Sequence, residues 1–188
     1  MPSAPTAPDG ATPGGAVEAV VASRLRDVPD FPQPGVVFKD ITPLLADPVA
    51  FATVIQALGD RHRGAVDLVA GVEARGFVVG AALAHAMGVG FVPVRKAGKL
   101  PGDTVSISYD LEYGSAEIEV HADALVGGER VLLVDDVLAT GGTAAAAGDL
   151  LEQVGADVVG FECVVELGFL GGRARMGSRA VGALLVVP

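Results

Sequence analysis

Strongly apolar segments of the chain alternate with segments in which apolar residues recur at helical spacing. The apolar segments have no polar face, which is typical of strands that are buried on both sides. Such strands, alternating with helices, favour a parallel sheet covered on two faces, so we predict an α/β fold with a Rossmann-like parallel β-sheet flanked by helices. The predicted strands are residues 66–70, 90–95, 130–134, 158–165 and 180–187, and the predicted helices are 17–26, 48–63, 76–87 and 142–154.

Other segments depart from this alternation. Residues 105–109 and 116–120 alternate apolar and polar side chains, which predicts the two strands of an antiparallel ribbon. Residues 1–15 consist mainly of Pro, Ala, Thr and Gly and predict a disordered N-terminal tail. A single domain is therefore expected over residues 16–188.

Charge and composition disfavour some classes of partner. The formal net charge of −10 argues against duplex DNA or an anionic membrane held by general electrostatics, so we expect no nucleic-acid and no membrane partner. Residues 76–94 contain no Asp, Glu, Lys or Arg, but Gly88 and Gly90 interrupt them, which favours a buried helix and a buried strand over a membrane span. Cys163 has no disulfide partner and is expected to be a buried apolar residue.

The most informative motif runs from residue 131 to residue 143. Four apolar residues are followed by Asp135 and Asp136, and a turn of small residues then opens a predicted helix. Glycines let backbone N–H groups approach an anion, the helix N-terminus adds positive partial charge, and threonine hydroxyls can donate. The motif therefore predicts a site for a phosphate monoester, with carboxylates that can accept from hydroxyls or support a divalent cation. From the residue types alone, an exposed turn with a helix cap is the alternative.

Two further loops follow predicted strands, and ligands in parallel sheets bind beyond the carboxyl ends of the strands. In residues 71–76 a tight turn carries Arg75, whose guanidinium and neighbouring amides can bind a highly charged group. The loop after the next strand concentrates the cations Arg95, Lys96 and Lys99. For both loops, an ordinary turn with solvated charges is the alternative.

Residues 131–143 resemble the phosphoribosyl pyrophosphate signature of the type I phosphoribosyltransferases, and the resemblance covers residues 17–188 with the motifs in the expected order. It implies the fold of that family, with a small hood at about residues 28–45 and a flexible β-ribbon loop at about residues 96–116. In that family the small-residue loop holds a 5′-phosphate. The phosphate-binding residues implied here are Ala139, Thr140, Gly141, Gly142 and Thr143.

The resemblance also implies a catalytic set. Asp135 and Asp136 meet the ribose hydroxyls, and Arg75 meets the pyrophosphate. Glu112 is implicated in proton handling at the base, while Tyr113 approaches the substrate from the same loop. The residues expected at the pyrophosphate are Glu73, Ala74 and Arg75, in the loop that matches the family's pyrophosphate loop, and the cations Arg95, Lys96 and Lys99, which are concentrated at the same predicted ligand edge. Without the resemblance, Glu112 and Tyr113 fit an ordinary β-ribbon.

A base pocket is implied by an apolar segment near the N-terminus. Phe38 stacks on a purine, while backbone groups near Val37 and Lys39 contact its edge. Leu167 covers the opposite face. The string Glu-Ala-Arg-Gly-Phe at residues 73–77 resembles the adenine-specific members of the family. Phe38 as an ordinary core residue is the alternative.

The implied activity is transfer of the 5-phosphoribosyl group from phosphoribosyl pyrophosphate to adenine, which gives AMP and pyrophosphate. Mg²⁺ is the expected cofactor, held mainly through substrate oxygens, and no residue is expected as a dedicated metal ligand. A cytoplasmic homodimer is also implied. One alternative is a phosphoribosyltransferase for a 6-oxopurine such as xanthine. Another is a non-catalytic regulator that binds phosphoribosyl pyrophosphate, although residues 1–30 are too short and too rich in Pro and Gly for the DNA-binding domain that a regulator usually has.

Overall fold

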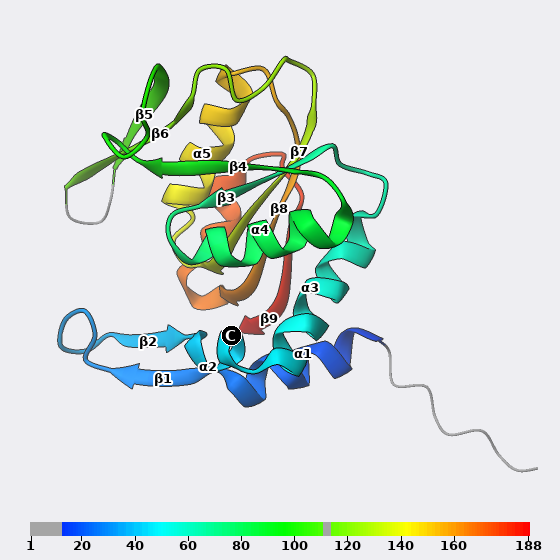
Figure 1. Ribbon diagram of the computed structural model, residues 1–188. Coiled ribbons are helices and arrows are strands. Elements are labelled where there is room, and N and C mark those ends of the chain that lie inside the picture. The colour runs from blue at the N-terminus through cyan, green and yellow to red at the C-terminus, as the bar shows by residue number, and fades with distance from the viewer. Residues whose placement is uncertain (1–12, 111–113) are drawn as a thin grey trace, which may run out of the picture.

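The computed structural model describes residues 13–110 and 114–188 of the 188-residue chain. Its main sheet is formed by β3 (Leu68–Val72), β4 (Gly90–Lys96), β5 (Thr104–Asp110), β6 (Ser115–His121), β7 (Arg130–Leu138), β8 (Asp157–Leu167) and β9 (Val181–Val187). The helices that pack on it are α3 (Pro48–His62), α4 (Arg75–Met87) and α5 (Gly142–Gln153). The strand order is β5-β6-β4-β3-β7-β8-β9 (Figure 1). The strands from β4 to β9 in this order are parallel, and the β5–β6 ribbon extends the sheet antiparallel at the β4 edge.

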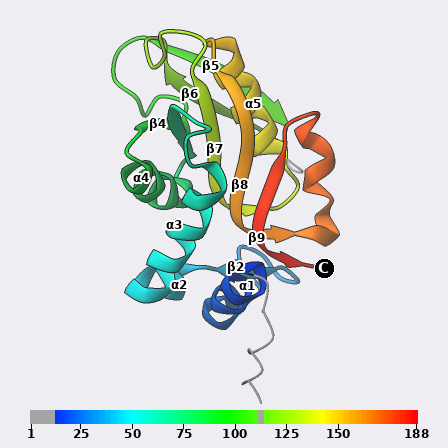
Figure 2. The same cartoon turned by 90° about the vertical axis from the view of Figure 1, so that its right-hand side faces the viewer.

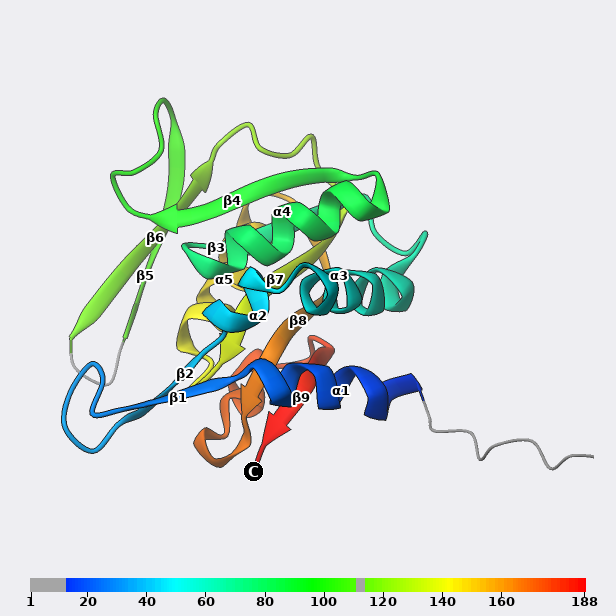
Figure 3. The ribbon, with the colours of Figure 1, turned by 60° about the horizontal axis from the view of Figure 1, so that its bottom comes forward.

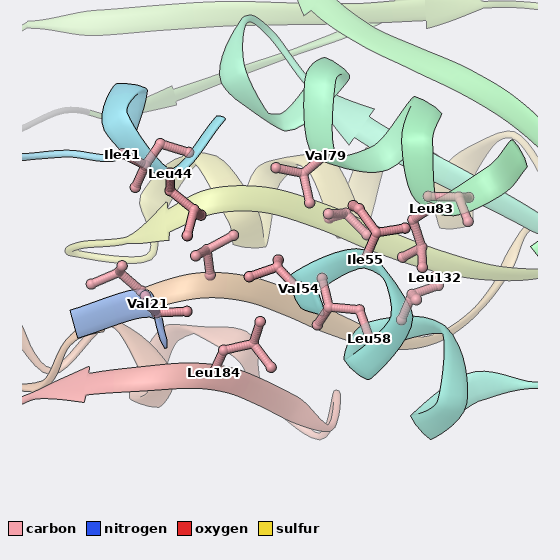
Figure 4. Packing of buried hydrophobic residues seen from close by; sticks show 14 of the residues in the cluster. Val21, Ile41, Leu44, Val54, Ile55, Leu58, Val79, Leu83, Leu132 and Leu184 are labelled. Carbon is pink, nitrogen blue, oxygen red and sulfur yellow. The ribbon is translucent and has the colours of Figure 1, made fainter. Parts of the chain in front are cut away.

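The strand β7 shows why the sheet is covered on both faces. Val131 and Leu133 belong to an apolar cluster with α5. Leu132 and Val134 belong to another cluster, with α3 and α4, part of which is seen in Figure 4. Successive side chains of a strand point to opposite faces, so β7 contributes to both clusters. All four are fully buried, and burial of each stabilises the fold by roughly 1.5–3 kcal/mol. The predicted α/β fold is confirmed.

The ends of the helices follow from local chemistry. The Asp47 side chain caps α3 by accepting hydrogen bonds from the N–H groups of Val49 and Ala50, both at 3.0 Å. At the far end of α4, Gly88 adopts φ +71° and turns the chain toward β4. The uncharged residues 76–94 therefore form a helix and a strand, as predicted. No helix in the part of the chain that the structure describes combines the length and apolarity needed to cross a bilayer.

An N-terminal unit lies beyond the carboxyl ends of the parallel strands (Figure 2). It consists of α1 (Pro13–Arg24), β1 (Arg26–Pro29), β2 (Val37–Asp40) and α2 (Thr42–Ala46). β1 and β2 form an antiparallel ribbon in which Val28 lies opposite Phe38. Hydrogen bonds from the Thr42 hydroxyl and N–H, together with the ion pair to Arg26, lower the pKa of Asp40 to about 2. Asp40 thereby fixes the ribbon to α2.

The first helix begins earlier than predicted. α1 already includes residues 13–15, which the sequence analysis assigned to the tail, and it ends at Arg24 rather than at residue 26. Pro13 suits the first helical position because that position needs no N–H donor. Val21 is buried in the apolar cluster that also contains residues of α3 and α4, so α1 is part of the domain core.

The strand β7 is longer than predicted. The apolar run ends at Val134, but backbone pairing with β8 continues through Leu138. Asp135 and Asp136 therefore lie within the strand instead of following it, and the loop begins only at Ala139. Hydrogen bonding to the neighbouring strand, rather than side-chain polarity, decides where this strand ends. β3 is displaced in the same direction, by two residues from its predicted position.

Candidate active site

A cavity of about 570 Å³ opens beyond the carboxyl ends of the parallel strands. This edge is where ligands bind in open parallel α/β sheets, and small-molecule sites typically measure roughly 300–1,000 Å³. Many of the residues that the sequence analysis selected line this one cavity. They are Val37, Phe38, Lys39, Glu73, Ala74, Arg75, Lys96, Asp135, Asp136, Ala139, Thr143 and Leu167.

A smaller hollow of about 90 Å³ lies at the start of α5 and shares Asp135, Val137, Ala139 and Thr143 with the cavity. All of residues 139–143 line it. Gly141 adopts φ +82°, a conformation that a residue with a side chain rarely adopts, and it directly precedes the helix. The first N–H groups of a helix have no partner within it and attract anions. The hollow can therefore bind a phosphate through backbone groups.

The loop around this hollow is supported by the 3₁₀ turn η2 (Gly172–Met176). Gly141 and Gly172 pack backbone against backbone: a Cβ on Gly172 would overlap the carbonyl oxygen of Ala139, and one on Gly141 would overlap that of Gly172. Arg173 holds η2 in place, because it forms an ion pair with the buried Glu166. The sequence analysis did not predict this support, because the contact joins glycines that are far apart in the sequence.

Asp135 and Asp136 are neighbours on β7 in different surroundings. Asp136 is buried and forms an ion pair with Arg75. The Asp135 carboxylate accepts a hydrogen bond from the Asp136 N–H at 2.8 Å. Burial, followed by the negative charge of Asp136, raises the pKa of Asp135 well above its usual range. Gly76 permits this packing, since a Cβ there would lie only 2.9 Å from Asp135 Oδ1.

The loop between β3 and α4 is connected to the end of β4 by Glu73. Its carboxylate accepts hydrogen bonds from the Lys96 N–H at 3.1 Å and from Arg95 Nε at 3.3 Å. These contacts, with the bond from Lys96 the stronger, lower the pKa of Glu73. On the other side of the loop, the Arg75 guanidinium carbon lies 5.0 Å from the centre of the Phe38 ring. Arg75 therefore contacts both a predicted ribose residue and a predicted base residue.

Of the predicted cations, Arg95 and Lys96 end β4 and Lys99 follows it, and they are only partly gathered at the cavity. Lys96 lines it, whereas Arg95 and Lys99 line neither the cavity nor the phosphate hollow. The Arg95 guanidinium donates to the Lys99 carbonyl at 3.0 Å. The buried Glu119 on β6 accepts hydrogen bonds from the N–H groups of Lys99 and Leu100 at 2.8 and 2.7 Å and so anchors this turn. The sequence analysis missed Glu119 because an acid in an alternating ribbon resembles a solvent-facing residue.

The residues predicted for the base, Val37, Phe38, Lys39 and Leu167, all line the cavity. Phe31 packs edge-on against Phe38, with ring centres 5.2 Å apart. The Lys39 ammonium pairs with Asp27 at 2.7 Å, which suits the expectation that this residue contributes backbone groups. Leu170, in the 3₁₀ turn η1 (Gly168–Leu170), also lines the cavity. It was missed because the glycine-rich segment around it predicts no defined structure.

The segment predicted as a flexible loop, residues 96–116, contains β5 and the start of β6. Glu112 and Tyr113 fall in residues 111–113, which lie outside the described residues, so their predicted roles stay predictions. The β5–β6 ribbon projects to the same side of the molecule as the β1–β2 ribbon (Figures 1 and 3).

Comparison with known proteins decides the family. The phosphoribosyl transferase domain matches residues 41–176. An adenine phosphoribosyltransferase of Streptomyces avermitilis is 62% identical over 172 residues, which cover 90% of this chain and 93% of that protein. The chain belongs to the adenine phosphoribosyltransferase family.

Solved adenine phosphoribosyltransferases share the fold. The crystal structure from Thermoanaerobacter pseudethanolicus has a TM-score of 0.87 at 46% identity and covers 91% of this chain and 99% of its own. The structure from Saccharomyces cerevisiae, complexed with adenine and an imino-altritol bisphosphate, has a TM-score of 0.86 at 41% identity and covers 90% and 99%. The predicted family, fold and enzyme class, an adenine phosphoribosyltransferase, are confirmed.

Proposed function

We propose that this chain transfers the 5-phosphoribosyl group of phosphoribosyl pyrophosphate to adenine at the cavity described above, with AMP and pyrophosphate as products. The observation that carries the proposal is that the phosphate hollow at residues 139–143 adjoins the cavity lined by Phe38 and Leu167, since Asp135, Val137, Ala139 and Thr143 line both. A nucleotide with its phosphate in the hollow and its base at Phe38 would place its sugar at the acids.

The 5-phosphoribosyl part of the substrate is held by backbone, hydroxyl and carboxylate groups. The N–H groups that open α5 and the hydroxyls of Thr140 and Thr143 donate to the 5′-phosphate. Asp135 and Asp136 accept hydrogen bonds from the ribose 2′ and 3′ hydroxyls. Both anchors sit on β7 and the helix that follows it, so the rigid sheet fixes the distance between them.

The reaction separates charge, and the site has groups for both signs. Displacement of pyrophosphate at the anomeric carbon passes through an oxocarbenium-like state, as in other glycosyl transfers. Asp135 and Asp136 stabilise the positive charge that develops on the ribose. Arg75 and Lys96, both at the cavity, stabilise the negative charge on the leaving pyrophosphate.

The adenine pocket combines apolar faces with backbone groups. Phe38 provides a stacking surface for adenine. Leu167, at the end of β8, and Leu170, in η1, cover the adenine ring from a second chain segment. Backbone donors and acceptors near Val37 and Lys39 contact the adenine edge and distinguish it from a 6-oxopurine. Glu112 handles the proton at the base in this proposal, on the strength of the family resemblance.

The donor set fits a Mg²⁺ ion that arrives with the substrate. Within residues 13–110 and 114–188, no group of three or more His, Cys, Asp or Glu side chains is placed to hold a metal. The cavity carboxylates of β7 are Asp135 and Asp136, and the latter is paired with Arg75. Mg²⁺ retains much of its water and binds readily through phosphate oxygens. Held through the pyrophosphate, Mg²⁺ would supply positive charge at the leaving group.

The direct test is a panel of bases. Purified protein is mixed with Mg²⁺, phosphoribosyl pyrophosphate and adenine, hypoxanthine, guanine or xanthine, and the products are separated. We expect AMP and pyrophosphate from adenine, with kcat/KM at least about 100-fold lower for the 6-oxopurines, because a wrong base leaves polar groups of the site unpaired. A higher kcat/KM for xanthine than for adenine would show that xanthine, and not adenine, is the substrate. Absence of turnover with every base, combined with tight binding to duplex DNA, would indicate a regulator.

Assembly and location complete the proposal. On the family resemblance, the chain acts as a homodimer in the cytoplasm. Sedimentation equilibrium of the purified protein tests the dimer: a single species of twice the chain mass supports it, and a monomer at all concentrations contradicts it. Fractionation of cells that express the chain tests its location.

A further inference from the structure

Tyr109, at the end of β5, reaches the phosphate hollow from a different part of the sheet. Its hydroxyl lies 3.1 Å from Thr143 Oγ1, which is within hydrogen-bond distance. The ring is half-buried, and β5 packs beside α5 (Figure 3). Neither the motif analysis nor the proposed function gave Tyr109 a role.

The contact with the start of α5 is close. Gly142 is the first residue of the helix, and a Cβ there would lie 3.9 Å from Tyr109 Cδ2 and 3.5 Å from the Asp110 carbonyl oxygen. The end of β5 therefore packs over the first turn of α5, next to the N–H groups of the hollow. The Tyr109 hydroxyl is held by this packing of its own strand and ring.

The chemistry of the two hydroxyls determines which one donates and which one accepts in this hydrogen bond. A hydroxyl has one hydrogen and two lone pairs, whereas the oxygens of an ionised phosphate only accept. When Thr143 donates its hydrogen to the phosphate, it can take part in the bond to Tyr109 only as the acceptor. A bound phosphate therefore requires the chain Tyr109 O–H to Thr143 Oγ1 and Thr143 O–H to phosphate, and hydrogen bonds in such chains strengthen one another.

We propose that Tyr109 is a positioning residue for the 5′-phosphate, which it serves by holding the Thr143 hydroxyl with its hydrogen directed into the hollow. This inference rests on the proposed function, because it takes the hollow to be the phosphate site. It makes the β5–β6 ribbon part of the phosphate subsite. Ligands that carry a 5′-phosphate depend on Tyr109, and ligands that lack one do not.

The test compares Tyr109→Phe with wild type in direct binding measurements. The variant keeps the ring and removes only the hydroxyl. We expect the Kd of AMP and the KM of phosphoribosyl pyrophosphate to rise about three- to tenfold, the effect of one hydrogen bond, while the Kd of adenosine stays the same. Ser108→Ala is the matched control, because it removes an exposed hydroxyl from the neighbouring position of β5. It should leave all three constants unchanged.

A double-mutant cycle shows whether Tyr109 acts through Thr143. Thr143→Val removes the acceptor, so adding Tyr109→Phe to it should weaken AMP binding no further. The chain has two tyrosines and no tryptophan, so tyrosine labelled with ¹³C at Cζ gives an NMR signal that the Tyr109→Phe variant assigns. That signal should shift on addition of AMP but not of adenosine.

The outcomes separate this inference from the proposed function. Equal weakening of AMP and adenosine by Tyr109→Phe, or independent effects of the two substitutions in the cycle, overturns the role of Tyr109 while leaving wild-type catalysis in place. If wild-type protein binds AMP no more tightly than adenosine, the hollow is not a phosphate site, and the proposed function fails with it.

Discussion

Arg75, the first residue of α4, forms an ion pair with Asp136 on β7. The carboxylate is buried, whereas 42% of the Arg75 side chain is exposed. A buried charge needs such a partner, since water cannot solvate it. The cation predicted at the pyrophosphate therefore neutralises an acid predicted at the ribose.

This arrangement predicts that Asp136→Asn impairs catalysis much more than folding. The substitution removes the charge that faces the positive ribose, and kcat should fall by about 100-fold or more. Folding should suffer little, with a Tm within about 4 °C of wild type, because the half-exposed Arg75 remains hydrated without its partner. Steady-state kinetics and thermal unfolding measure the two effects.

The control for Asp136→Asn is Asp60→Asn, which disrupts a surface ion pair with Arg63. Exposed pairs of this kind contribute little, so both kcat and Tm should stay near those of wild type. A folded Asp136→Asn protein with wild-type turnover would remove the acid from the mechanism.

Asp135 gives stability a pH dependence opposite to that of most paired carboxylates. Because its pKa is raised in the folded protein, the folded state keeps the proton that the unfolded state releases from about pH 4 upward. Stability therefore falls as the pH rises through the interval between the two pKa values. Asp135→Asn cannot ionise and still accepts the Asp136 N–H, so the Tm of the variant should rise relative to that of wild type as the pH is raised above about 4.

Thermal unfolding at a series of pH values measures this difference. The exposed Asp103→Asn is the control, and its Tm should follow wild type throughout. A constant difference between Asp135→Asn and wild type across the series would show that Asp135 has an ordinary pKa.

The packing of Gly172 against the phosphate loop predicts a selective effect on one substrate. A Cβ in Gly172→Ala would displace the loop at Ala139, and the overlap should raise the KM of phosphoribosyl pyrophosphate about tenfold or more. The Kd of adenine should change little, since the base pocket does not include Gly172. Gly15→Ala is the control, because Gly15 is helical with open space around it. Equal losses for both substrates would mean that Gly172 supports the fold in general.

Local motifs explain what the sequence predicts well. The small residues 139–143 and the apolar run before them carry their chemistry in a continuous segment, so the phosphate hollow could be located without a structure. The order of strands and helices follows from the alternation of buried segments. Phe38 and Leu167 were placed at one pocket through the family resemblance, since neither has a local signal that distinguishes it from a core residue.

Contacts between distant segments explain what was missed. Glu119 anchors the turn at Lys99 only because β6 pairs with β4, a pairing that no local pattern contains. The extension of β7 past Val134 to Leu138 depends on its partner strand β8. Gly172 has no motif of its own, and its support of the phosphate loop is evident only from its approach to Ala139 and Gly141 in space.

A crystal structure of the protein with AMP tests the central claim most directly. We predict the 5′-phosphate in the hollow at residues 139–143, within hydrogen-bond distance of the N–H groups that open α5, with the ribose hydroxyls at Asp135 and Asp136 and the base against Phe38. A nucleotide bound elsewhere, or one whose phosphate lies outside that hollow, would contradict the account.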